Sequence, residues 1–577
     1  MREGRVTSSS PRPTGFRPGG RTAAAAFAVL ALLPTGAPTA SSLHTPRRHL
    51  EAVTAAVSEA DAVRFLEQAT FGPTAALIAH VQRVGFAGYL DEQFDAATSS
   101  YPNLAPMPPS SKDGCPAGSP ATCVRDNYTM YPLQVRFFKN ALGNDDQLRQ
   151  RVALALHEIL VVSGVKIQQP SQMAPYLDML LADAFANYRT ILSDLTLNPA
   201  MGHYLDMVNN DAPAPPANVS PNENYAREVM QLFSIGVNML NPDGSLVLDA
   251  GGNPVPTYTQ DTIEDFAHVF TGWTYAPLPG VPGVKHDPPN FMAPMWLYRN
   301  ATGVDANHDH GEKLLLSYPG AVHSTLPAGQ DGNTDLTQAL DNIFYHPNVG
   351  PFIGKQLIQH LVTSNPSPDY VRRVAQAFDD NGSGVRGDMR AVITAILLDP
   401  EARGDVKTDP AYGRLREPVL FITNVCRAVG ATSDGILAGQ ANAMGQNLFN
   451  SSSVFSYYPH EYQIPGTSLQ GPEFGIQSSL AASSRINFIN ALAFSRINSP
   501  APDPGTAADF SALAALAGDP SSLVAALDRL FLHDTMSPAA VAAVIGAVQA
   551  ILPSNALLRA QTAFYLVASS SQYQVAR

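Results

Sequence analysis

Glutamate and arginine recur at helical spacing in the segment 222–233, where they could carry out acid–base chemistry. Glu223 and Arg227 are four residues apart, and Glu228 follows directly. Residues three or four apart lie on one face of a helix. These side chains could therefore line a cleft as metal ligands or as a general acid and base. The same spacing is typical of an exposed ion pair, and spacing alone favours that second interpretation.

The sequence HDHGEK gathers imidazole, carboxylate and ammonium groups within a long loop. It contains His308, Asp309 and Lys313. Histidine together with carboxylates suits a divalent cation or the activation of a water molecule. The spacing matches no named zinc motif, and a solvent-exposed turn is the alternative interpretation.

A third polar segment surrounds the start of a predicted helix. Tyr258, Gln260 and Asp261 precede or open this helix, and Trp273 follows it. Asp261 is a candidate metal ligand together with the histidine and aspartate of HDHGEK. The alternative is structural, because the helix dipole favours acids in the first turn and aromatic rings favour the core.

His203 and Asp206 form a smaller cluster, three residues apart on one predicted helix face. This arrangement suits a metal site or a hydrogen-bonded histidine. A structural histidine held by its neighbour is the commoner arrangement.

The elements that must position these groups are mainly helical. Apolar residues recur with the helical period, and the sequence predicts a large multi-helical domain with long irregular loops. The predicted helices include 61–70, 147–162, 176–195, 222–236, 260–271, 335–345, 350–363, 368–380, 385–398, 414–429 and 476–495. One short β-hairpin is expected at 245–258. The longest predicted loop, 274–334, is aromatic and weakly periodic, and loops of that length are usually functional or poorly ordered.

Composition excludes several classes of protein. The chain has 577 residues, of which 45% are hydrophobic and 15% charged, with a formal net charge of −13. An acidic chain lacks the basic face that nucleic-acid binding requires. Three cysteines are too few for a disulfide-dense scaffold.

The first 42 residues are predicted to be a secretory signal peptide, and 43–60 a linker. Five arginines precede an apolar run of eleven residues, Ala23 to Leu33, and small residues follow. The run is too short to span a bilayer, which needs about 20 residues. Removal of the segment lowers the net charge to −17, since it carries five arginines and one glutamate. We expect a Sec-exported periplasmic or secreted protein without a membrane span.

Export makes the cysteines interpretable. Cys115 and Cys123 lie in one loop rich in proline, glycine and serine. In an oxidising compartment they are predicted to form a disulfide. Cys426 lies on the apolar side of a predicted helix and is expected to be a small core residue.

Many segments, in this order, resemble the DUF1800 family, whose members are exported bacterial proteins of unknown function. They include RFLEQATFGPT, ENYAREVMQLFSIGV, PTYTQDTIEDFAHVFTGW, HDHGEK, LREPV, SVFSYYPHEYQIPG and GPEF. The resemblance runs from residue 61 to residue 577 and implies a helical core, 61–497, with 498–577 as its C-terminal part. At 157–158 this chain has His-Glu where Ser-Gln is usual in the family. The family is often associated with a second one, DUF1501, which implies a DUF1501-like exported partner.

Three functions remain open at this stage. The first is an extracytoplasmic hydrolase, acting for example on a polysaccharide, with ENYARE, YTQD and HDHGEK in one pocket and a divalent metal as a candidate cofactor. The second is a non-catalytic helical scaffold or partner, favoured by the lack of HExxH, GxSxG, P-loop and CxxCH motifs. The third is a redox metal protein using histidines such as His203 and His308.

Overall fold

The computed structural model describes residues 57–213 and 220–577. The predicted signal peptide, 1–42, and most of the predicted linker, 43–60, lie outside these residues. The described part is about 50% helical, with 24 α-helices and three two-stranded sheets. This confirms the prediction of a mainly α fold.

The first third of the described chain forms nine helices. They are α1 (Glu59–Ala69), α2 (Ala75–Phe94), α3 (Ser111–Gly114), α4 (Cys123–Tyr128), α5 (Tyr131–Gly143), α6 (Gln147–Ile159), α7 (Pro170–Asp183), α8 (Tyr188–Leu197) and α9 (Pro199–Tyr204). The single helix predicted at 176–195 is wrong, because the chain breaks between α7 and α8. Asn187 caps α8 by accepting a hydrogen bond from the Arg189 amide, as asparagine commonly does at a helix start.

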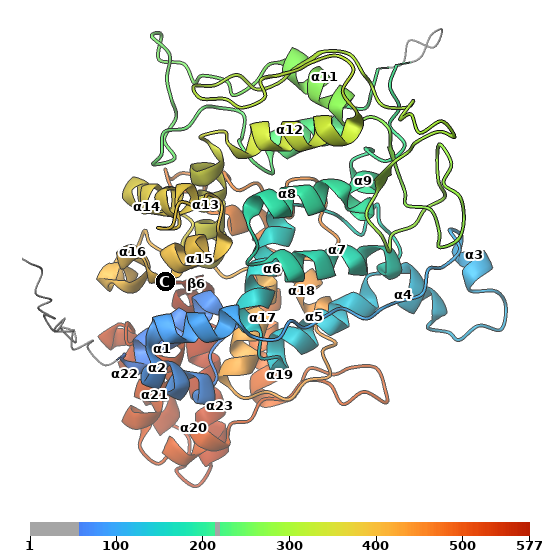
Figure 1. The fold of residues 1–577 in the computed structure, drawn as a ribbon. Helices are drawn as coiled ribbons and strands as arrows, with labels where there is room; N and C mark the ends of the chain where they lie inside the picture. The colour runs from blue at the N-terminus through green and yellow to red at the C-terminus, as the bar shows by residue number, and fades with distance from the viewer. Residues whose placement is uncertain (1–56, 214–219) are drawn as a thin grey trace, which may run out of the picture. The chain divides into compact units, whose positions relative to one another are not determined.

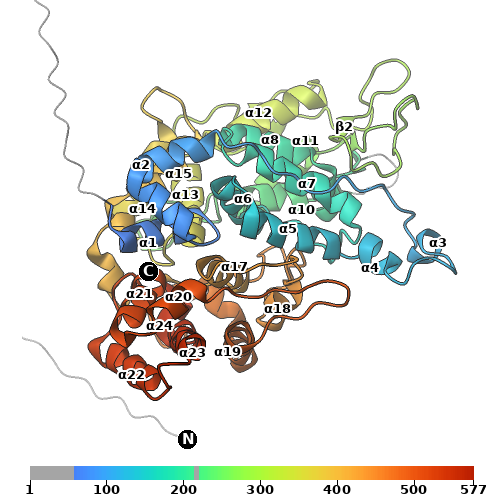
Figure 2. The ribbon, with the colours of Figure 1, turned by 90° about the horizontal axis from the view of Figure 1, so that it is seen from below.

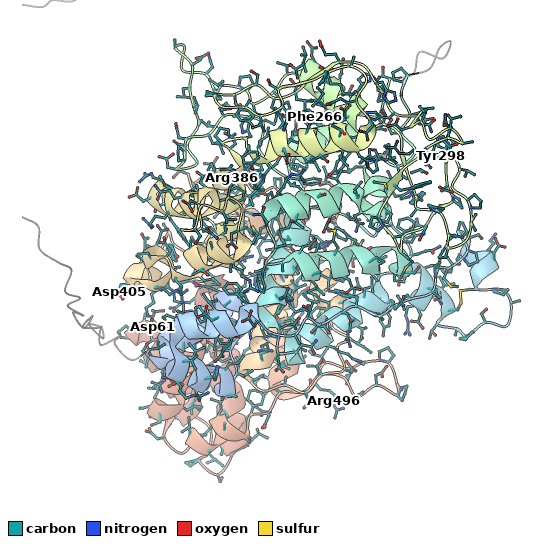
Figure 3. The ribbon with its side chains drawn as sticks, in the orientation of Figure 1. Asp61, Phe266, Tyr298, Arg386, Asp405 and Arg496 are labelled. Carbon is teal, nitrogen blue, oxygen red and sulfur yellow. A yellow bond between two sulfur atoms is a disulfide. The ribbon has the colours of Figure 1, made fainter. Side chains whose placement is uncertain are left out.

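The middle of the chain contains two of the small sheets. Its elements are α10 (Asn224–Gln231), α11 (Gln260–Val269), β1 (Trp273–Thr274), β2 (Trp296–Leu297), β3 (Lys313–Leu314), β4 (Thr325–Leu326), α12 (Gly332–Phe344), α13 (Val349–Leu361), α14 (Pro368–Asp379), α15 (Met389–Leu398) and α16 (Pro400–Arg403). Strand β1 pairs with β2 and β3 with β4, both antiparallel. The predicted hairpin at 245–258 forms isolated bridges such as Leu248 to Pro254 instead of strands, because proline cannot donate to a strand ladder. Phe266 of α11 is buried between that helix and α12 (Figure 3).

The C-terminal elements return to the first helix. They are a 3-10 helix η1 (Asp405–Thr408), β5 (Arg414–Leu415), α17 (Pro418–Ala428), α18 (Ala438–Ala443), a 3-10 helix η2 (Pro472–Ile476), α19 (Ser479–Phe494), α20 (Ser511–Leu516), α21 (Pro520–Leu532), α22 (Pro538–Gln549), α23 (Ala556–Ala568), α24 (Ser571–Gln574) and β6 (Val575–Ala576). Helix α21 packs against α1, and β6 pairs antiparallel with β5 (Figures 1 and 2). In the described residues no helix is long and apolar enough to cross a bilayer.

Helix α6 lies in the interior. Every one of its residues is buried, although they include Arg149, Arg151, His157 and Glu158. Helix α13, which packs against α6, is buried except at Lys355. Because a buried polar group without a partner costs several kcal/mol in free energy, the surroundings of α6 must supply hydrogen bonds.

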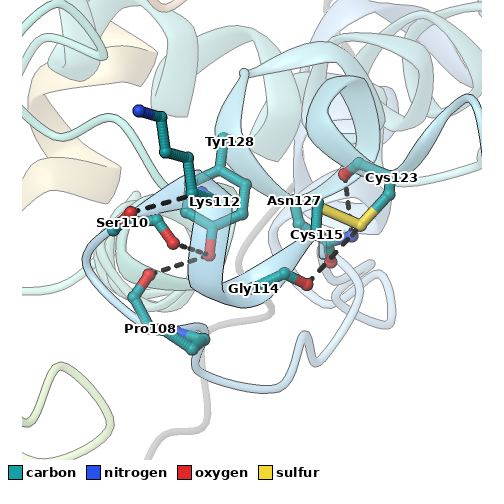
Figure 4. The surroundings of a disulfide bond; sticks show 8 residues. All are labelled: Pro108, Ser110, Lys112, Gly114, Cys115, Cys123, Asn127 and Tyr128. Carbon is teal, nitrogen blue, oxygen red and sulfur yellow. Dashed lines mark hydrogen bonds between the residues drawn. A yellow bond between two sulfur atoms is a disulfide. The ribbon is translucent and has the colours of Figure 1, made fainter. Parts of the chain in front are cut away.

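The Cys115 and Cys123 sulfurs form a disulfide that links the end of α3 to the start of α4 (Figure 4). The Tyr128 hydroxyl donates to the Pro108 carbonyl at 2.8 Å and reaches that of Ser110 at 3.2 Å (Figure 4). The disulfide and this tyrosine hold the segment 108–128 together. Cys426 is buried, as expected of a core residue.

A buried ion cluster joins the first helix to the C-terminal region. Glu67 of α1 accepts from Arg416 at 2.9 Å and lies 2.9 Å from His533 Nε2. Burial alone would raise the pKa of Glu67, but Arg416 and His533 outweigh it and lower the pKa to about 2. Folding therefore favours the ionised form of this carboxyl.

We expect Glu67→Gln to destabilise the protein by about 3 kcal/mol at neutral pH. The native pKa lies below that of the unfolded chain, so the contribution is present above pH 4.5 and is lost as the pH falls toward 2. Urea denaturation followed by circular dichroism measures the free energy of unfolding. The difference between wild type and Glu67→Gln should shrink as the pH falls over that range. Glu59→Gln, a more exposed position on the same helix, is the control and should stay within about 0.5 kcal/mol. A difference in the free energy of unfolding that does not change with pH would contradict the stabilising role of the ion cluster.

Candidate functional site

Helix α11 keeps the predicted site segments apart. At its start, Gln260 donates to Glu223 of the ENYARE segment at 2.9 Å. At its end, His268 Nδ1 lies 2.7 Å from Asp309 of HDHGEK. Eight residues of helix separate the two ends by about 12 Å. The structure therefore does not bring ENYARE, YTQD and HDHGEK into one pocket.

The ENYARE segment forms a surface network. Arg227 donates to Glu223 at 2.8 Å, and their side chains remain 39% and 30% exposed. An exposed pair of this kind contributes at most about 1 kcal/mol to stability. Glu228 is half-buried, burial raises its pKa, and its Oε2 has no hydrogen-bond partner among the described residues. Burial also raises the pKa of Tyr258 to about 12.

The HDHGEK segment belongs to a dry polar network centred on Asp335. This carboxylate accepts from Lys313 at 2.8 Å and from Gln330 at 2.7 Å, and it lies 3.1 Å from His308 Nε2. The side chains of His308, Lys313 and Asp335 are at most 2% exposed. A network in which each group has a partner and no solvent enters fixes packing, which is the structural interpretation of this motif.

The remaining predicted residues lie apart from one another. His203 Nδ1 is 3.1 Å from the Tyr275 hydroxyl, whereas Asp206 pairs with Lys166 at 2.6 Å. Asp261 is exposed in the first turn of α11, and Trp273 is buried in β1. Within the described chain, no three His, Cys, Asp or Glu side chains are grouped so as to hold a metal ion. His308, Asp309 and Asp261 therefore form no common ligand set.

A different set of titratable groups lines a small interior cavity. Glu158 of α6, His360 of α13, Tyr458 and Glu473 all contribute to its wall. The cavity volume is about 30 Å³, which is room for one or two water molecules. Three parts of the chain that are distant in sequence thus meet at a site large enough for a water molecule.

Two carboxyl groups share one amide beside this cavity. Gln446 Nε2 donates to Glu158 Oε1 at 2.9 Å and to Glu417 Oε2 at 2.8 Å. The other oxygen of Glu158 lies 3.2 Å from His360 Nδ1. The Tyr458 hydroxyl donates to Glu417 at 3.2 Å.

Arg414 links the carboxyl group of Glu417 to that of Glu473. Its Nε donates to Glu473 at 2.9 Å and its Nη2 to Glu417 at 3.2 Å. The Arg414 guanidinium and that of Arg151 also donate to the backbone carbonyl of His360. These contacts fix the arginine between two carboxylates and hold α13 against the cluster.

The environment drives these groups to different protonation states. Burial, together with the nearby Glu417, raises the pKa of Glu158 well above its ordinary value. Burial would also raise the pKa of Glu417, but Arg414 and Arg151 lower it to about 2. Burial raises the pKa of Glu473 although Arg414 opposes the shift, and burial lowers the pKa of His360 to about 3. The surroundings therefore favour a neutral Glu158 and a neutral imidazole beside an ionised Glu417.

A family model described as "Protein of unknown function (DUF1800)" matches residues 64–575. The chain belongs to the DUF1800 family. Comparison with curated proteins and with solved structures finds no match. Within the DUF1800 protein, segments that resemble the family supply much of the cluster: LREPV carries Glu417, SVFSYYPHEYQIPG carries Tyr458 and GPEF carries Glu473.

Sequence reasoning missed this cluster because each segment brings only one or two ionisable groups. Gln446 and Glu158, which are hydrogen-bonded, are 288 residues apart. The available signal was that LREPV and GPEF each place a glutamate beside proline. That signal identifies candidate residues but not their convergence.

For the dry network of the DUF1800 protein, we expect Asp335→Ala to cost about 3–5 kcal/mol of stability, because it leaves the buried Lys313 ammonium without its carboxylate. Asp261→Ala is the matched control, since both aspartates lie in the first turn of a helix but Asp261 is exposed. The control should stay within about 0.5 kcal/mol of wild type. Urea denaturation monitored by circular dichroism measures both. Equal stability of the two variants would show that the network does not hold the fold.

Proposed function

We propose that this DUF1800 protein is an exported hydrolase whose acid–base chemistry takes place in the cavity lined by Glu473 and His360. The observation that carries the proposal is a buried carboxyl with a raised pKa and a neutral imidazole in the wall of one water-sized cavity. A general acid–base group works best when its pKa lies near the working pH. Burial moves the Glu473 pKa in that direction.

Glu473 is the group that takes a proton from water and returns it to the leaving group. Arg414 holds one of its oxygens at 2.9 Å, and the Ser364 hydroxyl donates to the other at 3.3 Å. These bonds orient the carboxyl, and Arg414 opposes the rise of its pKa. His360 is uncharged at neutral pH and can accept or donate a hydrogen bond to water or to a polar substrate group. The protonated carboxyl of Glu158 is the neutral group that lies next to His360 Nδ1.

The location and substrate class complete the proposal. The N-terminal arginines, the apolar run and the short Ala-Ser segment support export. The disulfide between Cys115 and Cys123 supports an oxidising compartment. A substrate outside the cytoplasm, such as a polysaccharide, fits that location. In this proposal Glu223, Arg227, Glu228, His308, Asp309 and Lys313 are not the catalytic groups.

A second function, as partner of a DUF1501-like exported enzyme, is favoured by one feature of the surface. Leu278, Val281 and Val284 are 49%, 53% and 51% exposed within seven residues of one loop. Exposed apolar side chains that lie close together can mark an interaction site. This function requires no turnover by the DUF1800 protein itself.

We expect Glu473→Gln to lower hydrolytic activity by at least about 100-fold, because the amide cannot exchange a proton. Chromogenic glycosides and esters assayed with the purified protein give the measurement. Glu158→Gln should retain activity, since it keeps a neutral group of the same size at that position, and Glu223→Gln should change activity less than about twofold. Folding of each variant is verified by circular dichroism. Full activity in Glu473→Gln would contradict the assignment, and a wild-type protein inactive on every compound would favour the partner function.

A further inference from the structure

A second, larger cavity lies away from the acid cluster. Its volume is about 910 Å³, and none of its lining residues belongs to the wall of the small cavity. This volume is within the usual range for small-molecule and cofactor sites. The predicted site residue His203 lies in its wall.

The segments that line this cavity differ in chemistry. Residues 166–172, around the start of α7, contribute amide and hydroxyl groups, among them Gln168, Gln172 and Ser171. The loops 106–109 and 277–293 contribute mainly proline, methionine, leucine and phenylalanine, together with Asn290. The cavity wall therefore combines polar amides with apolar and aromatic groups.

Aromatic rings in the wall are held in place by their neighbours. The Phe291 ring centroid lies 5.5 Å from that of Tyr275 and 6.0 Å from that of His203. The Tyr275 hydroxyl lies 3.1 Å from His203 Nδ1. Tyr128, also in the wall, is anchored by hydrogen bonds to the segment that carries the disulfide (Figure 4). Such fixed rings are ready to receive a ligand without further ordering.

The wall carries almost no charge. Of the described residues that line it, only Lys166 is formally charged at neutral pH, and its ammonium is already paired with Asp206 at 2.6 Å. Burial lowers the pKa of His203, which keeps that imidazole neutral. A charged ligand would find no counter-charge here, so the cavity suits an uncharged one.

Two polar atoms of the wall residues lack a hydrogen-bond partner. Gln169 Oε1 and Ser171 Oγ are buried and have none within the described part of the chain, and both residues are 4% exposed. Buried polar groups in proteins nearly always have a partner. Because both atoms are shielded even though the cavity is empty, they do not face it, and the more exposed amides of Gln168 and Gln172 are the wall groups that a ligand can reach.

We propose that the larger cavity binds an uncharged oligosaccharide. A sugar ring has an apolar C–H face that can pack on Phe291, Tyr275 and Tyr128, and hydroxyl groups at its edge. Each hydroxyl both donates and accepts, as do the amides of Gln168 and Gln172 in the cavity wall. The polar edge and the apolar face of one ligand thus match the amides and the aromatic rings of the wall.

The inference goes beyond the proposed function and does not rest on it, because the two cavities share no lining residue. Binding is measured without turnover, so a failure of one claim is distinguishable from a failure of the other. Glu473→Gln should bind the oligosaccharide with wild-type affinity because Glu473 does not line this cavity.

The experiment is isothermal titration calorimetry of the purified protein with neutral hexasaccharides, namely cellohexaose, xylohexaose and mannohexaose. We expect saturable binding of at least one of them and none of an oligogalacturonate of equal length. Phe291→Ala should weaken binding about tenfold through the loss of ring stacking. Gln172→Ala, which removes one partly exposed amide without disturbing a packed ring, should weaken it about fivefold. Phe494→Ala, an exposed aromatic position on α19, is the control and should leave affinity unchanged.

Three results would overturn the proposal. The first is the absence of binding by all three neutral oligosaccharides. The second is binding that neither Phe291→Ala nor Gln172→Ala weakens. The third is saturable binding of a monoacylglycerol or of a proline-rich peptide in place of the sugars, which would assign the apolar wall to a different class of ligand.

Discussion

Removing the charged side chains of α6 from water is the constraint around which the surrounding structure is built, and it is met only in part, since atoms of Arg149, Arg151 and Glu158 lack a hydrogen-bond partner in the described residues. The helix is buried along its whole length and carries both guanidinium and carboxyl groups. A buried charge without a partner costs several kcal/mol, and no single neighbouring helix supplies all the partners. Arg151 donates a hydrogen bond to a backbone carbonyl of α13, and Glu158 accepts one from the side-chain amide of Gln446. The convergence of α6, α13, β5 and the segment around η2 follows from this requirement.

The two buried polar networks, around Asp335 and around Glu158, differ in how completely their groups are hydrogen-bonded. Around Asp335 the charged groups have partners and the network is closed to solvent. Around Glu158 the hydrogen bonding is incomplete, since one oxygen of its carboxyl group lacks a partner within the described residues. A small cavity also remains beside it. An incompletely satisfied network beside a water-sized space is costly for stability and suited to proton transfer. The first network is therefore a packing device, and the second is the better candidate for chemistry.

Local parts of the structure could be predicted from the sequence, whereas the candidate site could not. Helical period and capping residues predicted many of the longer helices, such as α6, α13 and α14. The neighbouring Glu223 and Arg227 pair as their spacing indicated. The break between α7 and α8 was missed because apolar residues continue through it and tertiary packing decides the boundary. Glu417 and Glu473 were visible as members of short motifs, but nothing local shows that Arg414 lies between them. A site assembled from distant segments becomes apparent only when the chain is folded.

The central claim is that burial next to Glu417 keeps Glu158 protonated at neutral pH, so that α6 contributes a neutral carboxyl to the cluster. Fourier-transform infrared spectroscopy detects the carbonyl stretch of a protonated carboxyl directly. The difference spectrum of wild type minus Glu158→Gln at pH 7 should contain one such band, which disappears only at a pH well above the ordinary pKa of glutamate. A difference spectrum that shows a carboxylate band and no protonated carboxyl at pH 7 would contradict the account.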